Sequence, residues 1–189
     1  MSQCAQWVGF HGTSVLNASS IMSTQFRVSS QERDWLGTGV YFFVDALGLL
    51  PPVEKAEQWA NFRARSASPR YSALSVLEVS IETGFYLDLD DEQHIAALNV
   101  IKTEYMEVMK REGRTPTGNR LKDKCAFCNF VMHEHGVDAL VRREYIKTTD
   151  FEDMYGLEGG VPNCRVLCVK DPAASIKNVS YAVARRNVR

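Results

Sequence analysis

The stretch Leu36-Gly37-Thr38-Gly39-Val40-Tyr41-Phe42-Phe43 joins a tight glycine-rich turn to a short apolar segment that carries one tyrosine. Glycine adopts backbone conformations that other residues rarely reach, which is typical of a sharp turn. The four residues after the turn are β-branched or aromatic, and they predict a strand. Because this Gly-x-Gly leads into a strand rather than a helix, it does not match the phosphate-binding turn of a dinucleotide fold.

A second short motif, Phe10-His11-Gly12-Thr13, lies near the start of the sequence. Trp7-Val8-Gly9-Phe10 predicts a strand that ends at this motif, and Thr13 or Ser14 can cap the helix that follows. That helix has one apolar face, formed by Val15, Leu16, Ala18, Ile21 and Met22. A histidine after a strand and a tyrosine between apolar residues are usually structural, so neither motif alone defines a function.

The rest of the sequence mixes further helices with short strands. We expect helices over residues 54–67, 91–111 and 121–135, and strands over residues 74–81, 86–89, 139–141, 166–169 and 176–179. A long polar stretch, 142–163, precedes the strand at 166–169, and structureless loops beyond about 12–15 residues are often functional. This mixture predicts one α+β domain over residues 1–189.

The composition is that of an ordinary globular protein. Apolar residues make up 45% of the chain and charged residues 24%, and the formal net charge of −1 lacks the basic excess of a dedicated nucleic-acid binder. The sequence has no apolar run of the ~20 residues that a membrane helix needs, and its start does not match a signal peptide. We therefore expect a cytoplasmic protein with no membrane partner, whose 5 cysteines are reduced thiols.

Together and in this order, the two motifs resemble the ADP-ribosyltransferase superfamily, in the His-Tyr branch related to poly(ADP-ribose) polymerases and diphtheria toxin. That family has His-Gly-[Thr/Ser] on a first strand, Gly-x-Gly-[Val/Ile]-Tyr-Phe on a second, and usually Glu at the start of a third. The first two parts match at residues 11–13 and 37–42. A weaker resemblance covers most of the chain, at Trp59-Ala60, Val76-Leu77-Glu78-Val79, Asp138-Ala139-Leu140-Val141-Arg142 and the strand before Asp171-Pro172.

This resemblance implies a fold of two small packed β-sheets flanked by helices, with NAD⁺ as co-substrate in the cleft between them. It also implies roles for single residues. His11 would bind the ribose hydroxyl of the nicotinamide riboside, and the Gly12 backbone would hold the carboxamide. Tyr41 would stack on the nicotinamide ring, in which case Tyr41→Phe is expected to be nearly silent.

Four more residues receive cofactor-binding roles from the same resemblance. Thr13 or Ser14 would help to fix the adenosine-side ribose, and Gly37 and Gly39 would let the backbone approach the cofactor. Breaking the bond from ribose to nicotinamide builds oxocarbenium character at the sugar, as in glycoside hydrolysis. The site must therefore orient the dinucleotide and stabilise positive charge at one carbon.

The third part of the family pattern has no direct match. The strand expected at 166–169 is preceded by Asn163-Cys164-Arg165, so Arg165 occupies the place where the family carries its acid. The nearest upstream acid is Glu158, and the two glycines after it, at 159 and 160, give the loop freedom to bend. We predict that Glu158 is the third catalytic residue, with Glu144 and Glu152 as alternatives.

Cys125-x-x-Cys128 with His133 and His135 provides candidate zinc ligands. All four residues lie on one expected helix, and a single helix rarely surrounds a tetrahedral ion. We therefore expect no metal and interpret these cysteines as small apolar residues of a buried helix face. Cys164 and Cys168 alternate on one strand face and are interpreted as core residues.

The expected function is mono-ADP-ribosyl transfer from NAD⁺ to a macromolecular acceptor. The chain resembles small bacterial members in particular, several of which are toxins of toxin–antitoxin or phage-defence systems, so an antitoxin protein is a candidate partner. The loop at 142–163 mixes cations, aromatics and acids, which leaves the acceptor open between RNA and protein. Alternatives are an NAD⁺ glycohydrolase, an inactive NAD⁺- or ADP-ribose-binding module and, less favoured, a zinc-dependent RNA-binding protein.

Overall fold

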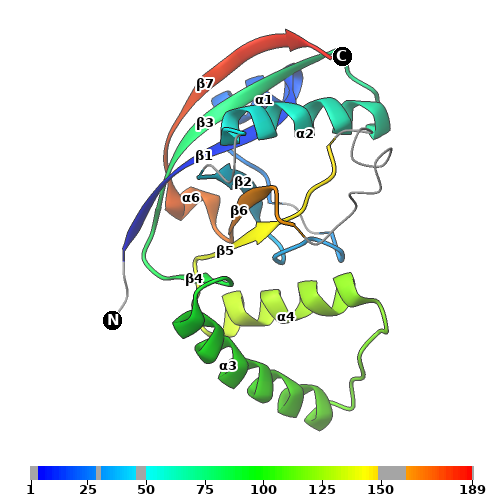
Figure 1. The fold of residues 1–189 in the computed structure, drawn as a ribbon, viewed down its shortest axis with the longest axis vertical. Coiled ribbons are helices and arrows are strands. Elements are labelled where there is room, and N and C mark those ends of the chain that lie inside the picture. Colours follow the sequence, from blue (N-terminus) through cyan, green and yellow to red (C-terminus); the bar gives the residue numbers. More distant parts are fainter. Residues whose placement is uncertain (1–3, 29–30, 46–49, 149–160, 189) are drawn as a thin grey trace.

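Seven strands form one mixed sheet in the order β4-β5-β6-β2-β1-β3-β7 (Figure 1). The structure, a computed structural model, describes residues 4–28, 31–45, 50–148 and 161–188. Its strands are β1 (Ala5–Ser14), β2 (Val40–Val44), β3 (Ala73–Thr83), β4 (Tyr86–Asp88), β5 (Ala139–Glu144), β6 (Cys164–Val169) and β7 (Ile176–Asn187). Its helices are α1 (Val15–Ser23), α2 (Pro52–Ser66), α3 (Glu92–Arg111), α4 (Arg120–Glu134) and the short α6 (Pro172–Ser175). The expected α+β class is confirmed.

β1, at the centre of the sheet, pairs extensively with one neighbouring strand and only briefly with the other. β1 pairs with β3 along its whole length, from Ala5↔Thr83 to Ser14↔Leu74. On its other side β1 pairs with β2 only at Gly9↔Val44 and Phe10↔Phe43. The two small sheets expected from the sequence are therefore one hydrogen-bonded sheet, because this short pairing connects β1-β3-β7 to β4-β5-β6-β2.

Helices cover both faces of the sheet. Ala56 and Ala60 of α2 and Met132 of α4 share one core cluster with alternate residues of β2 and β6. Ala18 of α1 and the buried Phe26 belong to a second cluster, which holds the other alternate residues of the same strands. Such alternation places successive side chains of a strand on opposite faces. β2 and β6 are thus buried on both sides.

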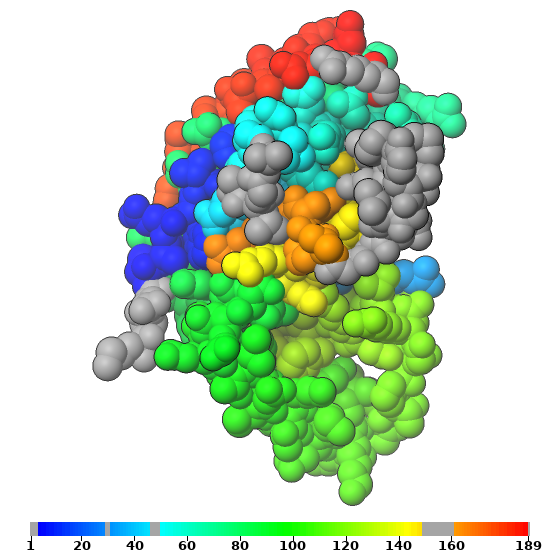
Figure 2. Space-filling view, viewed as in Figure 1, coloured from blue at the N-terminus to red at the C-terminus, as the bar shows by residue number. Residues whose placement is uncertain are grey.

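Two helices extend beyond the β4 and β5 end of the sheet. α3 and α4 pack against each other there and form the lower part of the molecule in the view of Figures 1 and 2. The Asp91 side chain caps α3 and the Asn119 side chain caps α4, each accepting hydrogen bonds from two backbone N–H groups. No residue of α3 is buried, whereas α4 buries Cys125, Cys128, Val131 and Met132.

Two elements near the C-terminus differ from the expectation. β7 extends over Ile176–Asn187, well beyond the predicted 176–179, and the short helix α6 was not expected. β7 lies at the sheet edge and most of its side chains are exposed, so its sequence lacks the alternation that predicts a strand. Its length is set by hydrogen bonding to β3 instead.

The cysteines near the sheet are core residues, as their pattern indicated. Cys125 and Cys128 of α4 and Cys164 and Cys168 of β6 are all buried free thiols. Burial raises the pKa of Cys128 and of Cys164 to about 12, so these thiols remain protonated. Within the described ranges, no group of three or more His, Cys, Asp or Glu residues is arranged to hold a metal ion.

Among the residues that the structure describes, no helix is both long enough and apolar enough to cross a lipid bilayer.

Candidate functional site

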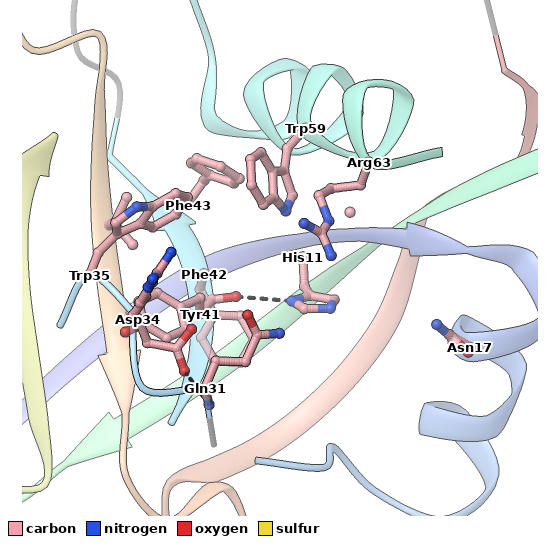
Figure 3. A pocket seen from close by; sticks show the side chains of 13 residues that line it. His11, Asn17, Gln31, Asp34, Trp35, Tyr41, Phe42, Phe43, Trp59 and Arg63 are labelled. Atoms are coloured by element: carbon pink, nitrogen blue, oxygen red, sulfur yellow. Dashed lines mark hydrogen bonds between the residues drawn. The ribbon is translucent and has the colours of Figure 1, made fainter. Parts of the chain in front are cut away.

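A cavity of about 500 Å³ opens where β1 and β2 separate, beneath α2 (Figure 3). Its volume falls within the range of about 300–1,000 Å³ that is usual for small-molecule sites. Aromatic, cationic and amide side chains share the lining, which among the described residues consists of His11, Gly12, Asn17, Gln31, Arg33, Asp34, Trp35, Tyr41, Phe42, Phe43, Trp59, Arg63 and Val166. The two motifs of the sequence therefore meet at one cavity.

His11 contacts the backbone of Tyr41 just beyond the last β1–β2 backbone pair, Phe10↔Phe43. The Nδ1 atom of His11 lies 2.9 Å from the backbone carbonyl oxygen of Tyr41. Since a carbonyl can only accept, Nδ1 carries the proton in this bond. A hydrogen bond from a side chain of β1 therefore connects it to β2 beyond the last paired residues of the two strands.

The surroundings of His11 keep its imidazole neutral. Burial lowers the pKa of His11, and the bond to the Tyr41 carbonyl opposes this effect only in part. Phe26 and Phe42 make edge-on ring contacts with the imidazole, at centroid distances of 5.3 and 6.0 Å. Within the described part of the chain Nε2 has no hydrogen-bond partner, so a neutral His11 offers this nitrogen as an acceptor at the cavity.

The Tyr41 hydroxyl is bound into the turn that precedes its strand. It donates to the Gly37 carbonyl at 2.6 Å and accepts from the Leu36 N–H at 2.8 Å. Burial raises the pKa of Tyr41, so the phenol stays protonated. The ring lines the cavity and contacts Trp35 edge-on at a centroid distance of 6.0 Å. The hydroxyl therefore fixes the ring and the turn together.

The three candidate glycines are required by protein packing. A β-carbon on Gly12 would lie 1.8 Å from the Ala56 carbonyl oxygen, so glycine is what lets α2 approach β1. One on Gly39 would lie 2.5 Å from the Cys168 sulfur. Gly37 has a φ of +88° and closely faces α4, at Asn129 and Met132. Gly12 lines the cavity, whereas Gly37 and Gly39 do not.

Thr13 and Ser14 lie beyond the cavity lining. Ser14 is buried and caps α1, where its hydroxyl accepts from the Asn17 N–H at 3.1 Å. The Thr13 hydroxyl lies 3.4 Å from the Asn17 side-chain nitrogen. Asn17 itself lines the cavity, so the structure places this amide, rather than either hydroxyl, at the site.

The candidate acids are distributed differently from the sequence pattern. Glu158 and Glu152 lie outside the described residues. Glu144 accepts a hydrogen bond from Lys124 at 2.7 Å and does not line the cavity. Arg165 faces away from the cavity, where it pairs with Asp45 and, at 2.6 Å, with Asp88. The β6 residue that lines the cavity is Val166.

The described lining also contains two tryptophans, an arginine and an aspartate that are not part of the two motifs. Trp59 and Arg63 extend from α2 above His11, and Trp35 lies on the opposite side (Figure 3). The Trp35 and Trp59 rings contact at a centroid distance of 5.3 Å, and the Arg63 guanidinium lies 5.7 Å from the Trp59 centroid. The fourth is Asp34, the one acid in the described lining.

Only part of this set leaves a signal in the sequence. Trp59 and Arg63 are four residues apart, which places them on one helix face. A tryptophan beside Ala56 and Ala60 in a helix normally indicates core, and Trp59 does pack partly against the core cluster, so its sequence gives no sign of the cavity. Asp34 and Trp35 come from the irregular segment between α1 and β2, where no periodicity indicates which side chains point inward.

Comparison with protein-family models and with curated proteins finds no match to this chain.

Proposed function

We propose that this protein binds NAD⁺ in the cavity between β1, β2 and α2 and transfers its ADP-ribose group to a macromolecular acceptor. One observation carries the proposal: the two motif residues, His11 and Tyr41, line the same cavity and are joined by a 2.9 Å hydrogen bond. The resemblance of the two motifs to His-Tyr ADP-ribosyltransferases supplies the activity. The gap between β1 and β2 is the counterpart of the cleft expected for that fold.

The lining suits the separate parts of a dinucleotide. The neutral His11 imidazole presents an acceptor nitrogen, which fits a ribose hydroxyl. Flat rings such as nicotinamide and adenine stack on aromatic side chains, with about 1–3 kcal/mol per base in nucleic-acid complexes. Tyr41, Trp35 and Trp59 offer such surfaces. Arg63 and Arg33 add positive charge that fits a pyrophosphate.

The first test separates transfer from simple hydrolysis. Purified protein is incubated with NAD⁺ labelled in the adenine half, with and without cell lysate, and nicotinamide release is measured together with the fate of the label. Label on protein or RNA supports transfer, and the treatment that removes the label, protease or ribonuclease, identifies the acceptor. Free ADP-ribose as the only product in both samples identifies an NAD⁺ glycohydrolase instead.

A second candidate function is an NAD⁺- or ADP-ribose-binding module without chemistry. It is favoured by the apolar Val166, which lines the cavity from the strand where the family carries its acid. Calorimetric titration with NAD⁺ and with ADP-ribose separates this candidate from the enzyme. Binding of either ligand without any nicotinamide release over hours would support the module and contradict the transferase.

A further inference from the structure

We propose that Asp34 supplies the catalytic carboxylate of this site, a role that neither β6 nor the motif pattern assigns to it. The inference rests on the proposed function and concerns how the same cavity would perform it. Asp34 is the one acidic side chain among the described lining residues, on the same cavity as His11 and Tyr41 (Figure 3). It belongs to the segment before β2 rather than to the third strand.

A local turn fixes the position of this carboxylate. Its Oδ2 atom accepts a hydrogen bond from the Gln31 N–H at 3.2 Å, and the Asp34 N–H donates to the Gln31 carbonyl at 3.3 Å. The Cys125 thiol of α4 lies 3.6 Å from the same Gln31 carbonyl. This contact joins the turn to α4, so the carboxylate belongs to a turn that the fold supports.

Asp34 and Tyr41 lie on the same side of the cavity (Figure 3). Burial is the main cause of the raised pKa of Tyr41, and the charge of Asp34 contributes to the increase. The next residue, Trp35, contacts the Tyr41 ring edge-on at 6.0 Å. The segment 34–35 and the Tyr41 ring therefore form one wall of the cavity, opposite Trp59 and Arg63 of α2 (Figure 3).

The described acids near β6 do not line the cavity. Glu144 bonds to Lys124 and is also 3.5 Å from an Arg142 nitrogen, while Asp88 and Asp45 pair with Arg165 on the far side of β6. The site needs a negative charge because the ribose carbon becomes positive as the nicotinamide bond breaks. Asp34 is the described lining residue able to provide that charge.

The step balances with this residue alone. The bond between the ribose anomeric carbon and the nicotinamide nitrogen breaks, and its electron pair leaves with nicotinamide. An acceptor hydroxyl or carboxylate oxygen forms a new bond to the same carbon. Where the acceptor is a hydroxyl, its proton passes to the Asp34 carboxylate, which acts as a general base. Before that transfer the negative carboxylate stabilises the oxocarbenium character of the sugar.

The decisive variant is Asp34→Asn. Asparagine keeps a side-chain oxygen that can accept from the Gln31 N–H, so this hydrogen bond is preserved while the negative charge is removed. We expect nicotinamide release to fall on the order of 10²-fold or more, which is the range of a positioned acid–base group. The affinity for NAD⁺, measured by calorimetry, is expected to stay within a few-fold of wild type.

Glu32→Gln is the matched control, because Glu32 belongs to the same turn, does not line the cavity and bonds to Lys122. It is expected to keep wild-type turnover. An active Asp34→Asn beside an inactive Glu158→Gln overturns the proposal and assigns the acid to the long loop. Loss of NAD⁺ binding in Asp34→Asn also overturns it, since the residue would then shape the cavity. A wild-type protein that releases no nicotinamide overturns the proposed function itself.

Discussion

The imidazole of His11 and the backbone carbonyl of Tyr41, 30 positions apart in the sequence, form a 2.9 Å hydrogen bond at the point where β1 and β2 separate. The bond has two effects. It places the proton of a neutral His11 on Nδ1, which leaves Nε2 as an acceptor. It also connects the two motifs of the sequence directly, so the position of one depends on the other.

The first prediction is that His11→Ala loses NAD⁺ turnover and remains folded. A hydrogen bond to a ribose hydroxyl contributes about 1–2 kcal/mol, so turnover is expected to fall by about 5- to 30-fold even if His11 only positions the substrate. Nicotinamide release measures the turnover, and a melting curve measures whether the variant remains folded. His133→Ala, which changes an exposed histidine of α4, is the control. Turnover equal to wild type would contradict the site assignment.

The second prediction concerns pH and the same histidine. Burial lowers the pKa of His11 below its ordinary value of 6.5, so the unfolded chain binds this proton more readily than the folded protein. The stabilisation from His11 is therefore fully present above about pH 6.5 and is lost as the pH falls towards the folded pKa. Denaturant unfolding of wild type and His11→Ala across pH 5–8 should show their difference in stability shrinking on the acid side. A pH-independent difference would contradict the buried neutral state.

The third prediction revises the expectation for Tyr41→Phe. A purely stacking tyrosine would tolerate the change, but the hydroxyl bonds both the Gly37 carbonyl and the Leu36 N–H. Removing it leaves two backbone groups without this partner, at a cost of about 1–3 kcal/mol. The melting temperature should fall by roughly 2–4 °C for each kcal/mol. Tyr181→Phe on the exposed edge strand should melt like wild type. NAD⁺ affinity is expected to change little, because the ring remains.

The fourth prediction is that Gly12→Ala disturbs both the fold and the cavity. The new β-carbon would lie 1.8 Å from the Ala56 carbonyl oxygen. This oxygen belongs to the backbone of α2, which cannot rotate out of the way as a flexible side chain can. α2 must then move away from β1, carrying Trp59 and Arg63 with it. We expect a loss of about 3 kcal/mol or more of stability, at the upper end for an overpacked core, and weaker NAD⁺ binding.

Gly113→Ala gives the comparison for that variant. Gly113 has a φ of +66° and no atom within 4 Å of the added carbon, so its replacement costs only backbone strain of about 1–2 kcal/mol. Denaturant unfolding and NAD⁺ titration of both variants measure the difference. Equal losses of stability would mean that the contact between Gly12 and Ala56 does not restrict α2.

Sequence reasoning predicted most of the elements because their patterns are local. Caps, turns and apolar periodicity placed α1, α3, α4, β2 and β6, and the two motif residues, His11 and Tyr41, line one cavity. The family resemblance assigned Gly37 and Gly39 to the cofactor site. In the structure, a β-carbon on either glycine would collide with other protein atoms. A glycine in a turn looks the same in both cases, and only the atoms around its missing side chain distinguish them.

The rest of the cavity depends on contacts between distant parts of the chain. Arg63 reaches the cavity only because Gly12 lets α2 lie against β1. Arg165 stands next to Val166 in the sequence, and strand alternation alone turns one to Asp88 and the other to the cavity. Which of the two faces the cavity follows from the register of β6 with β2 and β5, which the local sequence does not encode.

The sheet order also has a consequence for synthesis of the protein. Among the described residues, every one that lines the cavity except Val166 lies within 11–63, so the ribosome produces nearly all of this described wall in the first third of the chain. β2, however, pairs with β1 at only two positions and otherwise depends on β6, which is made more than 100 residues later. Such long-range pairing forms late in folding. A nascent chain stalled before residue 164 should therefore carry the wall residues without a formed site, and any activity would begin only when translation is nearly complete.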